Sequence, residues 1–187
     1  MNNQYKQPAL FLDRDGVINV DHGYVGKYED FDFIEGIFDA VLFFQSKGFL
    51  PVVVTNQSGI ARGYYTETDF EVLMERVQDD FSTHGIHSLP FYFCPHHLDG
   101  NIPKYATKCA CRKPAPGMLL SAAQDLKIDL ANSVLVGDSW RDIQAADAAG
   151  LKQSFFLSKD NASGEQRAQL SKDHTVTRIE SLKELVT

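Results

Sequence analysis

The sequence predicts an α/β fold in which a parallel sheet has helices on both faces. Short apolar runs alternate with segments of helical periodicity along the chain, which is the pattern of repeated strand–helix units. The apolar runs are continuous, as expected of strands buried on both sides. Several runs are followed at once by polar residues, where open α/β sheets place their ligand sites. No linker or internal repeat divides the 187 residues, so we expect one domain over residues 1–187.

The first half of the chain contains three of the expected strands. In order, we expect a strand at Ala9–Leu12, a loop at 20–33, a helix at 35–48, a strand at 50–54, a helix from Thr66 to Gly85 and a strand at 91–93. The strands are apolar runs, and the second is rich in β-branched residues. Apolar residues recur at i, i+4 and i+7 in the first helix, and Thr66 with Asp69 resembles a capping box at the start of the second.

The second half begins with a long insertion, residues 94–112, that shows little periodicity. After it we expect a helix at 114–127, a strand at 133–136, a helix at 142–149, a strand at 155–157, a polar and mobile segment at 158–172 and a short helix at 182–186. The helices show apolar residues on one face, and Gly150 is a typical helix-ending residue.

Composition excludes several classes of protein. The formal net charge is −7, and no basic stripe is present to neutralise the phosphates of a nucleic acid. No run approaches the roughly 18 apolar residues of a membrane helix, and the first residues do not resemble a secretory signal. Three cysteines are an odd number, and their spacing suits a metal better than disulfides. We therefore expect a cytoplasmic protein.

Four polar clusters follow strands or begin helices, and the expected topology brings them to one edge of the sheet. They are Asp13 with Asp15, Thr55 with Asn56, Arg112 with Lys113, and Asp138 with Asp142. Asp13 and Asp15 point to the same side of an extended chain. Two carboxylates this close need a shared proton, a hydrogen-bond donor or a cation. Mg²⁺ is the natural partner of such oxygen ligands.

These clusters predict phosphoryl transfer. A lysine and a cation would offset the charge of a phosphate dianion, one carboxylate would attack phosphorus, and the other would transfer protons. Each cluster also has a simpler interpretation. Asp138 suits a helix N-cap, Asn56 with Gly59 suits a turn, and Lys113 beside Arg112 suits a solvated pair. The combination in this order favours the catalytic interpretation.

The segments FLDRDG, VVTNQSG, RKP and VGDSWRD resemble the four motifs of the haloacid dehalogenase-like (HAD) hydrolases. The resemblance extends over residues 9–156 and implies a Rossmann-like three-layer fold. It implies that Asp13 is the nucleophile that forms an aspartyl-phosphate, and that Asp15 is the general acid and then the base. Thr55 and Lys113 would bind the phosphate. The implied Mg²⁺ ligands are Asp13, Asp138 and the backbone carbonyl of Asp15, with Asp142 close by.

A second constellation lies in the insertion, at about residues 94–111. Cys94 and His96 are one residue apart, as are Cys109 and Cys111. Three cysteines and one histidine are a common structural zinc set, and four protein ligands leave no open catalytic position. His97 is the competing ligand, and buried structural cysteines are the alternative. We expect a zinc-clamped loop that forms one wall of an open cleft. The stretch between Asp15 and Thr55 is too short for a large cap domain.

The segments TNQSGIARGYYTE and CPHH…CACRKPAPGM resemble the corresponding segments of phosphatases that act on heptose 1,7-bisphosphates. This resemblance implies hydrolysis of the 7-phosphate on the route to the ADP-heptose of lipopolysaccharide. The IARG portion favours it, because Arg62 can reach a second anion. The implied substrate-binding residues are Asn56, Gln57, Ser58, Arg62 and Arg112.

Histidinol-phosphate phosphatases share FLDRDG and a similar zinc loop and are the alternative. An inactive, metal-binding interaction module is a more remote one. Some relatives have a lysine where this chain has Ser139, which leaves a lysine role at that position in doubt. The motifs lie within one chain, so we expect a monomer whose partner is a small sugar bisphosphate.

Overall fold

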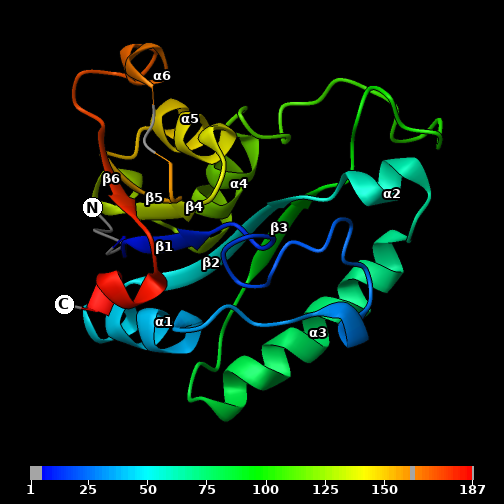
Figure 1. The fold of residues 1–187 in the computed structure, drawn as a ribbon, viewed down its shortest axis with the longest axis horizontal. Coiled ribbons are helices and arrows are strands. Elements are labelled where there is room, and N and C mark those ends of the chain that lie inside the picture. The colour runs from blue at the N-terminus through cyan, green and yellow to red at the C-terminus, as the bar shows by residue number, and fades with distance from the viewer. Residues whose placement is uncertain (1–5, 161–162, 187) are drawn as a thin grey trace, which may run out of the picture.

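The computed structural model describes residues 6–160 and 163–186, and its centre is one six-stranded parallel sheet (Figure 1). The strand order is β3-β2-β1-β4-β5-β6, and each neighbouring pair is parallel. The strands are β1 (Ala9–Leu12), β2 (Leu50–Asn56), β3 (Phe91–Cys94), β4 (Val134–Gly137), β5 (Gln153–Leu157) and β6 (Thr175–Ile179). The chain reverses its direction of winding between β1 and β4, which is where such sheets form a crevice.

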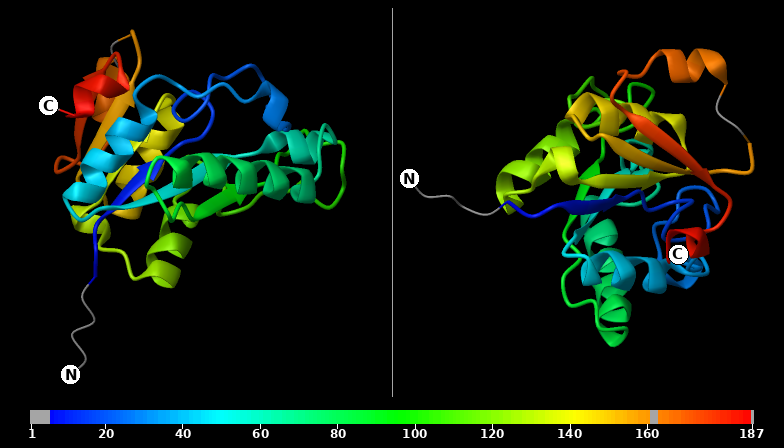
Figure 2. Two further views of the ribbon diagram at one scale, coloured as in Figure 1. Left: turned by 90° about the horizontal axis from the view of Figure 1, so that it is seen from below. Right: turned by 90° about the vertical axis from the view of Figure 1, so that its left-hand side faces the viewer.

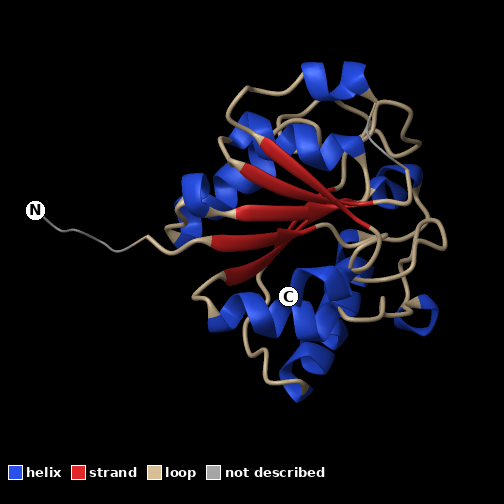
Figure 3. Ribbon diagram, turned by 60° about the vertical axis from the view of Figure 1, so that its left-hand side comes forward, coloured by secondary structure: helices blue, strands red, loops and turns tan. Residues whose placement is uncertain are grey.

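Helices cover both faces of the sheet, as Figures 2 and 3 show. Alternate residues of β1 enter two separate cores: Leu10 and Leu12 face one layer, and Ala9 and Phe11 face the other. The first layer contains α1 (Ile37–Ser46), α3 (Glu67–Thr83) and the 3₁₀ turns η1 (Tyr28–Asp30) and η3 (Leu182–Val186). The second contains α4 (Gly117–Leu126) and α5 (Trp140–Ala149), and η2 (Leu130–Asn132) lies between α4 and β4. The predicted three-layer α/β fold is confirmed.

Several short elements were not predicted, including a short helix and an edge strand. Helix α2 (Ser58–Arg62) has five residues, too few to show a helical period. Strand β6 alternates exposed and more buried positions at the edge of the sheet, and its polar residues mask its strand character. The segment 158–172 was predicted to be mobile. Residues 161–162 of that segment lie outside the described residues, and α6 (Gly164–Ala168) forms within the rest.

The connection from β1 to β2 contains only η1 and α1 within its fully described residues, so no large cap domain is inserted there. The insertion after β3 runs without helix or strand and contacts α2, where the Ile102 amide donates to the Ala61 carbonyl at 2.9 Å. Among the described residues, no helix has the length and apolar character needed to cross a bilayer.

Candidate active site

The carboxyl ends of β1, β2 and β4 surround a polar cavity of about 450 Å³. Strand β1 delivers Asp13 and Asp15, β2 ends in Thr55 and Asn56, and Asp138 follows β4. Parallel neighbours end at the same edge of a sheet, and this edge is where the four predicted clusters meet. The cavity therefore contains all five predicted catalytic and magnesium-binding residues, which are Asp13, Asp15, Thr55, Lys113 and Asp138.

Lys113 lies at the centre of the charged groups. Its side chain is only 1% exposed, and its Nζ lies 3.0 Å from Asp13 Oδ1 and 2.6 Å from Asp142 Oδ1. It also donates to the Val54 carbonyl at 2.8 Å. Asn56 fixes this lysine, because its amide accepts from the Lys113 N–H at 3.0 Å and donates to the Lys113 carbonyl at 3.1 Å. The alternative of a solvated Lys113 is thus wrong.

Burial and like charges raise the pKa values of the carboxylates. Burial, followed by the nearby Asp142, raises the pKa of Asp13 to about 8 despite the opposing effect of Lys113. Burial and Asp142 likewise raise the pKa of Asp138 to about 6. Burial alone would lower the pKa of Lys113, but Asp13 and Asp142 outweigh it and raise that pKa. The site therefore has more negative charge than the buried Lys113 neutralises.

The arrangement fits a divalent cation. Carboxylate oxygens of Asp13, Asp138 and Asp142 all lie within 4.8 Å of one another. The two oxygens of Asp142 are engaged by Lys113 and by the Ser139 N–H at 3.0 Å, so Asp13 and Asp138 are the more available ligands. A Cβ on Gly16 would collide with Asp138 Oδ2, so only glycine allows this close approach.

Ser139, and not Asp138, begins helix α5. The Ser139 hydroxyl accepts from the Arg141 N–H, and the Asp142 carboxylate accepts from the Ser139 N–H. The alternative in which Asp138 caps the helix is wrong, and its side chain is left facing the cavity. Ser139 serves the helix start and also lines the cavity.

Asp15 is held by a residue that sequence reasoning missed. Arg14 Nη2 donates to both carboxylate oxygens of Asp15, at 2.7 and 2.9 Å. The guanidinium is fully buried and lies 5.9 Å from the ring of Phe31 and 5.4 Å from that of Phe70. An arginine between two aspartates looks like an exposed charge in sequence, and only the packing around it shows otherwise.

The predicted substrate-binding residues divide into two groups. Ser58, Arg62 and Arg112 line the cavity. Gln57 and Asn56 also border it, but protein groups occupy most of their amide atoms. Gln57 is 1% exposed and donates to Asp15 and Thr55, and Asn56 is bonded to Lys113. The structure thus favours positioning roles for these two amides. Sequence reasoning missed six other lining residues, which are Asp21, Gly23, Tyr24, Tyr65, His97 and Arg141.

The second constellation also converges. The Cys94 Sγ lies 3.5 Å from the Cys109 Sγ and 3.0 Å from the Cys111 Sγ, and the His96 Nδ1 lies 3.4 Å from the Cys111 Sγ. Ligands of one tetrahedral zinc, with Zn–S near 2.3 Å, lie about 3.7 Å apart. Burial raises the pKa of the Cys94 thiol, so its thiolate needs a cation. His97 points elsewhere, because its Nδ1 accepts from the Asp99 N–H at 3.1 Å.

This metal-type cluster adjoins the cavity. Arg112 follows Cys111 directly and donates to the His96 carbonyl at 3.2 Å, while His97 lines the cavity wall. The loop therefore connects the cysteine and histidine cluster to the cationic side of the cavity. Its ligand atoms fit a structural metal, and the loop forms a wall of the cleft as predicted.

Replacing Lys113 with methionine is expected to reduce both turnover and stability. The change leaves Asp13 and Asp142 buried without their cation, a loss of about 3–5 kcal/mol for broken buried pairs. Thermal unfolding and phosphate release measure the two effects. Lys108→Met, at an exposed position of the same loop, is the control and should change neither. An active and equally stable Lys113→Met variant would contradict the central role of this lysine.

Comparison with known proteins places these features among phosphatases. The HAD-hydrolase-like family model matches residues 110–185. A D-glycero-beta-D-manno-heptose-1,7-bisphosphate 7-phosphatase of Vibrio cholerae is 52% identical over 151 residues, covering 81% of each chain. One of Escherichia coli K12 is 51% identical over 144 residues, covering 77% of this chain and 75% of its own. The crystal structure of a D,D-heptose 1,7-bisphosphate phosphatase from B. bronchiseptica, complexed with magnesium and phosphate, matches with a TM-score of 0.75 and 29% identity over 96% of both chains.

Proposed function

Because this chain belongs to the HAD-like hydrolases, in the family of heptose-1,7-bisphosphate 7-phosphatases, we propose that it removes the 7-phosphate of D-glycero-β-D-manno-heptose 1,7-bisphosphate. The chain is a phosphoric monoester hydrolase. The β anomer follows the names of the relatives. The product would be heptose 1-phosphate, for the ADP-heptose of lipopolysaccharide. We place the reaction in the cytoplasm. We also propose that the protein acts as a monomer, since every proposed site residue comes from one chain.

The proposed reaction has two steps, both at the carboxyl end of β1. In the first, a carboxylate oxygen of Asp13 bonds to phosphorus as the bond to the sugar oxygen breaks, and Asp15 gives its proton to that oxygen. In the second, Asp15 takes a proton from water as the water oxygen attacks phosphorus. This releases inorganic phosphate and restores the Asp13 carboxylate. Lys113, 3.0 Å from Asp13, and Thr55 support the phosphate.

Two metals belong to the proposal. Asp13, Asp138 and the Asp15 carbonyl would hold Mg²⁺, which when bound supplies positive charge for the phosphate oxygens. The crowded carboxylates and the raised pKa of Asp13 support this assignment. Cys94, His96, Cys109 and Cys111 would hold a structural Zn²⁺ that fixes the loop carrying Arg112.

The observation that carries the substrate proposal is a group of basic side chains that lines the cavity. Arg62, Arg112, Arg141 and His97 all line it. These side chains interact electrostatically. Burial is the largest cause that lowers the pKa of His97, and the charges of Arg112, Arg62 and Arg141 lower it further. Buried Nε of Arg62 has no partner among the described residues. No ion pair with a carboxylate is present for these arginines in the part of the chain that the structure describes, which suits a second phosphate, a group that a bisphosphate has and histidinol phosphate lacks.

The first test compares phosphate release from heptose 1,7-bisphosphate and from histidinol phosphate, with Mg²⁺, under matched conditions. The proposal predicts a kcat/KM for the bisphosphate that is at least about 100-fold higher, the scale of one lost charged contact pair. A preference for histidinol phosphate would keep the catalytic residues and overturn the substrate. Inactivity toward both would lead to a wider panel of sugar phosphates.

Arg112→Ala should weaken binding of the distal phosphate without slowing the chemistry. We expect KM for the bisphosphate to rise about 10-fold or more, with little change in kcat or in the KM for heptose 7-phosphate. The monophosphate serves as the internal control, because it lacks the group that Arg112 would bind. Equal losses on both substrates would show that Arg112 acts through the loop and not through the second phosphate.

A further inference from the structure

We propose that Tyr65 is a positioning residue for proton transfer, acting through Gln57 on the carboxylate of Asp15. The inference rests on the proposed function, in which Asp15 protonates the leaving oxygen. Three hydrogen bonds carry it. The Tyr65 hydroxyl lies 2.6 Å from Gln57 Oε1, and Gln57 Nε2 lies 3.0 Å from Asp15 Oδ2 and 2.7 Å from Thr55 Oγ1.

The chemistry of these partners fixes the orientation of the Gln57 amide. The NH₂ end of Gln57 faces Asp15 Oδ2 and Thr55 Oγ1, and an amide nitrogen only donates hydrogen bonds. The carbonyl end then faces Tyr65, whose hydroxyl must donate. Gln57 is 1% exposed, so bulk solvent does not compete for its amide. The Tyr65 hydroxyl thus supports the orientation in which the amide nitrogen donates to Asp15.

Gln57 holds the oxygen of Asp15 that the other partners leave less restrained. Asn19 donates to Oδ1 at 3.1 Å, and Arg14 Nη2 lies closer to Oδ1 than to Oδ2. Gln57 contacts Oδ2 and also joins it to the hydroxyl of Thr55, a proposed phosphate ligand. The Tyr65–Gln57 pair therefore sets the carboxylate relative to the bound phosphate.

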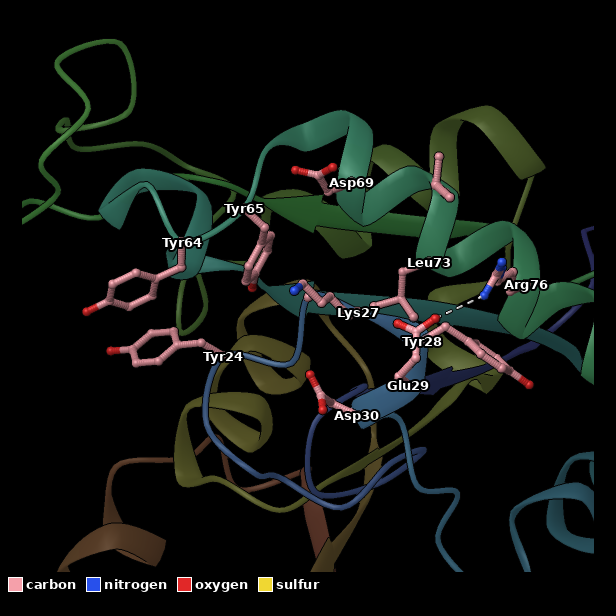
Figure 4. Close-up of a pocket in the computed structure, with 12 residues that line it drawn as sticks. Tyr24, Lys27, Tyr28, Glu29, Asp30, Tyr64, Tyr65, Asp69, Leu73 and Arg76 are labelled. Atoms are coloured by element: carbon pink, nitrogen blue, oxygen red, sulfur yellow. Dashed lines mark hydrogen bonds and ion pairs between the residues drawn. The ribbon is translucent and has the colours of Figure 1, made fainter.

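Packing around the ring holds Tyr65 in position for this contact. Figure 4 shows its ring pointing inward from the segment between α2 and α3, whereas Tyr64 and Tyr24 extend outward side by side. The ring lies against Gly26 and Gly59, where an added Cβ would collide with its carbons. It lines both the catalytic cavity and a second cavity of about 460 Å³. Burial raises the pKa of Tyr65 to about 12, so the hydroxyl remains a donor near neutral pH.

Without the hydroxyl, Gln57 Oε1 is left buried with no hydrogen-bond donor, so the amide is held less firmly against Asp15 Oδ2 and Thr55 Oγ1. Protonation of the leaving group should then suffer most. An alkyl leaving group depends strongly on this proton, whereas p-nitrophenolate leaves without one. The loss should therefore depend on the leaving group, which a general loss of folding would not produce.

The test measures kcat/KM for Tyr65→Phe on heptose 1,7-bisphosphate and on p-nitrophenyl phosphate. This parameter covers the steps up to release of the first product, so hydrolysis of the aspartyl-phosphate does not enter. We expect a loss of about 10- to 100-fold on the sugar ester, smaller than the roughly 10²- to 10⁴-fold that general acid catalysis contributes in full, and less than about 3-fold on the aryl ester. Tyr64→Phe is the matched control, since Tyr64 is 61% exposed. The kcat/KM of this variant should be unchanged on both esters.

A second measurement separates the Tyr65–Gln57 pair from independent effects. In a Gln57→Leu background, Tyr65→Phe should cause no further loss, because the group through which it acts is already absent. Additive losses, equal losses on both esters, or full activity of Tyr65→Phe would each overturn the inference. Those results leave the proposed function standing as long as the unmodified chain hydrolyses the bisphosphate. Failure of the unmodified chain on every phosphate ester would overturn both.

Discussion

Asp13→Asn is expected to lose turnover by roughly 10⁴-fold or more while the protein stays folded. The amide cannot attack phosphorus as a carboxylate does, so the phospho-enzyme cannot form at this position. The substitution also removes one charge from a crowded, buried set, so it need not destabilise the chain. Phosphate release and thermal unfolding measure the two effects separately.

The same variant should change how stability depends on pH. Without Mg²⁺, the pKa of Asp13 is about 8 in the folded protein, against 3.8 for an ordinary aspartate. The folded chain therefore keeps a proton that the unfolded chain has lost, and its stability falls as pH rises from about 4 to about 8. An asparagine side chain has no such proton, so the slope should be smaller in Asp13→Asn. Added Mg²⁺ should stabilise the original chain at pH 8 and the variant much less.

Asp30→Asn is the control for both measurements, because Asp30 is an exposed carboxylate outside the catalytic cavity. It should retain turnover and the original pH dependence. Two results would contradict the nucleophile assignment: substantial activity in Asp13→Asn, or an unchanged response to Mg²⁺ together with an unchanged slope.

Cys109→Ser is expected to lose bound zinc, stability and activity together. The serine hydroxyl is a poor substitute for a thiolate, and the loop after β3 has no helix or strand to hold it without the metal. We expect the free energy of unfolding to fall by roughly 2 kcal/mol or more, because loss of a metal is among the causes of large single-residue effects. Activity should fall because Arg112 donates to the carbonyl of His96 and moves with the cluster.

Metal analysis and thermal unfolding of Cys109→Ser test this directly, with His97→Asn as the control for zinc content. The His97 ring accepts from the Asp99 amide and lies outside the cluster, so zinc should stay bound in that variant. A Cys109→Ser protein with its zinc and its thermal stability intact would show that the cysteines pack as ordinary buried side chains.

The sequence predicted the architecture well because strands and helices leave local periodic signals. The expected strand at Ala9–Leu12 agrees with β1 residue for residue, and Thr66 with Asp69 forms the predicted capping box. Helix α2 was not predicted because it is a single short turn. Strand β6 was not predicted because it is an edge strand in which exposed polar residues alternate with more buried ones. Spacing alone also brought Cys94, His96, Cys109 and Cys111 together, since the ligand pairs are close in sequence.

The tertiary structure alone decided how the site residues divide their work. Lys113 lies between Asp13 and Asp142, Arg14 is buried beside Asp15, and the amide of Gln57 joins Tyr65 to Asp15. The sequence by itself determined which residues reach the edge of the sheet, because strand ends follow from local pattern and parallel strands end at the same edge. It could not determine which atoms face one another there, because those contacts join distant segments and depend on burial and packing that no local spacing encodes.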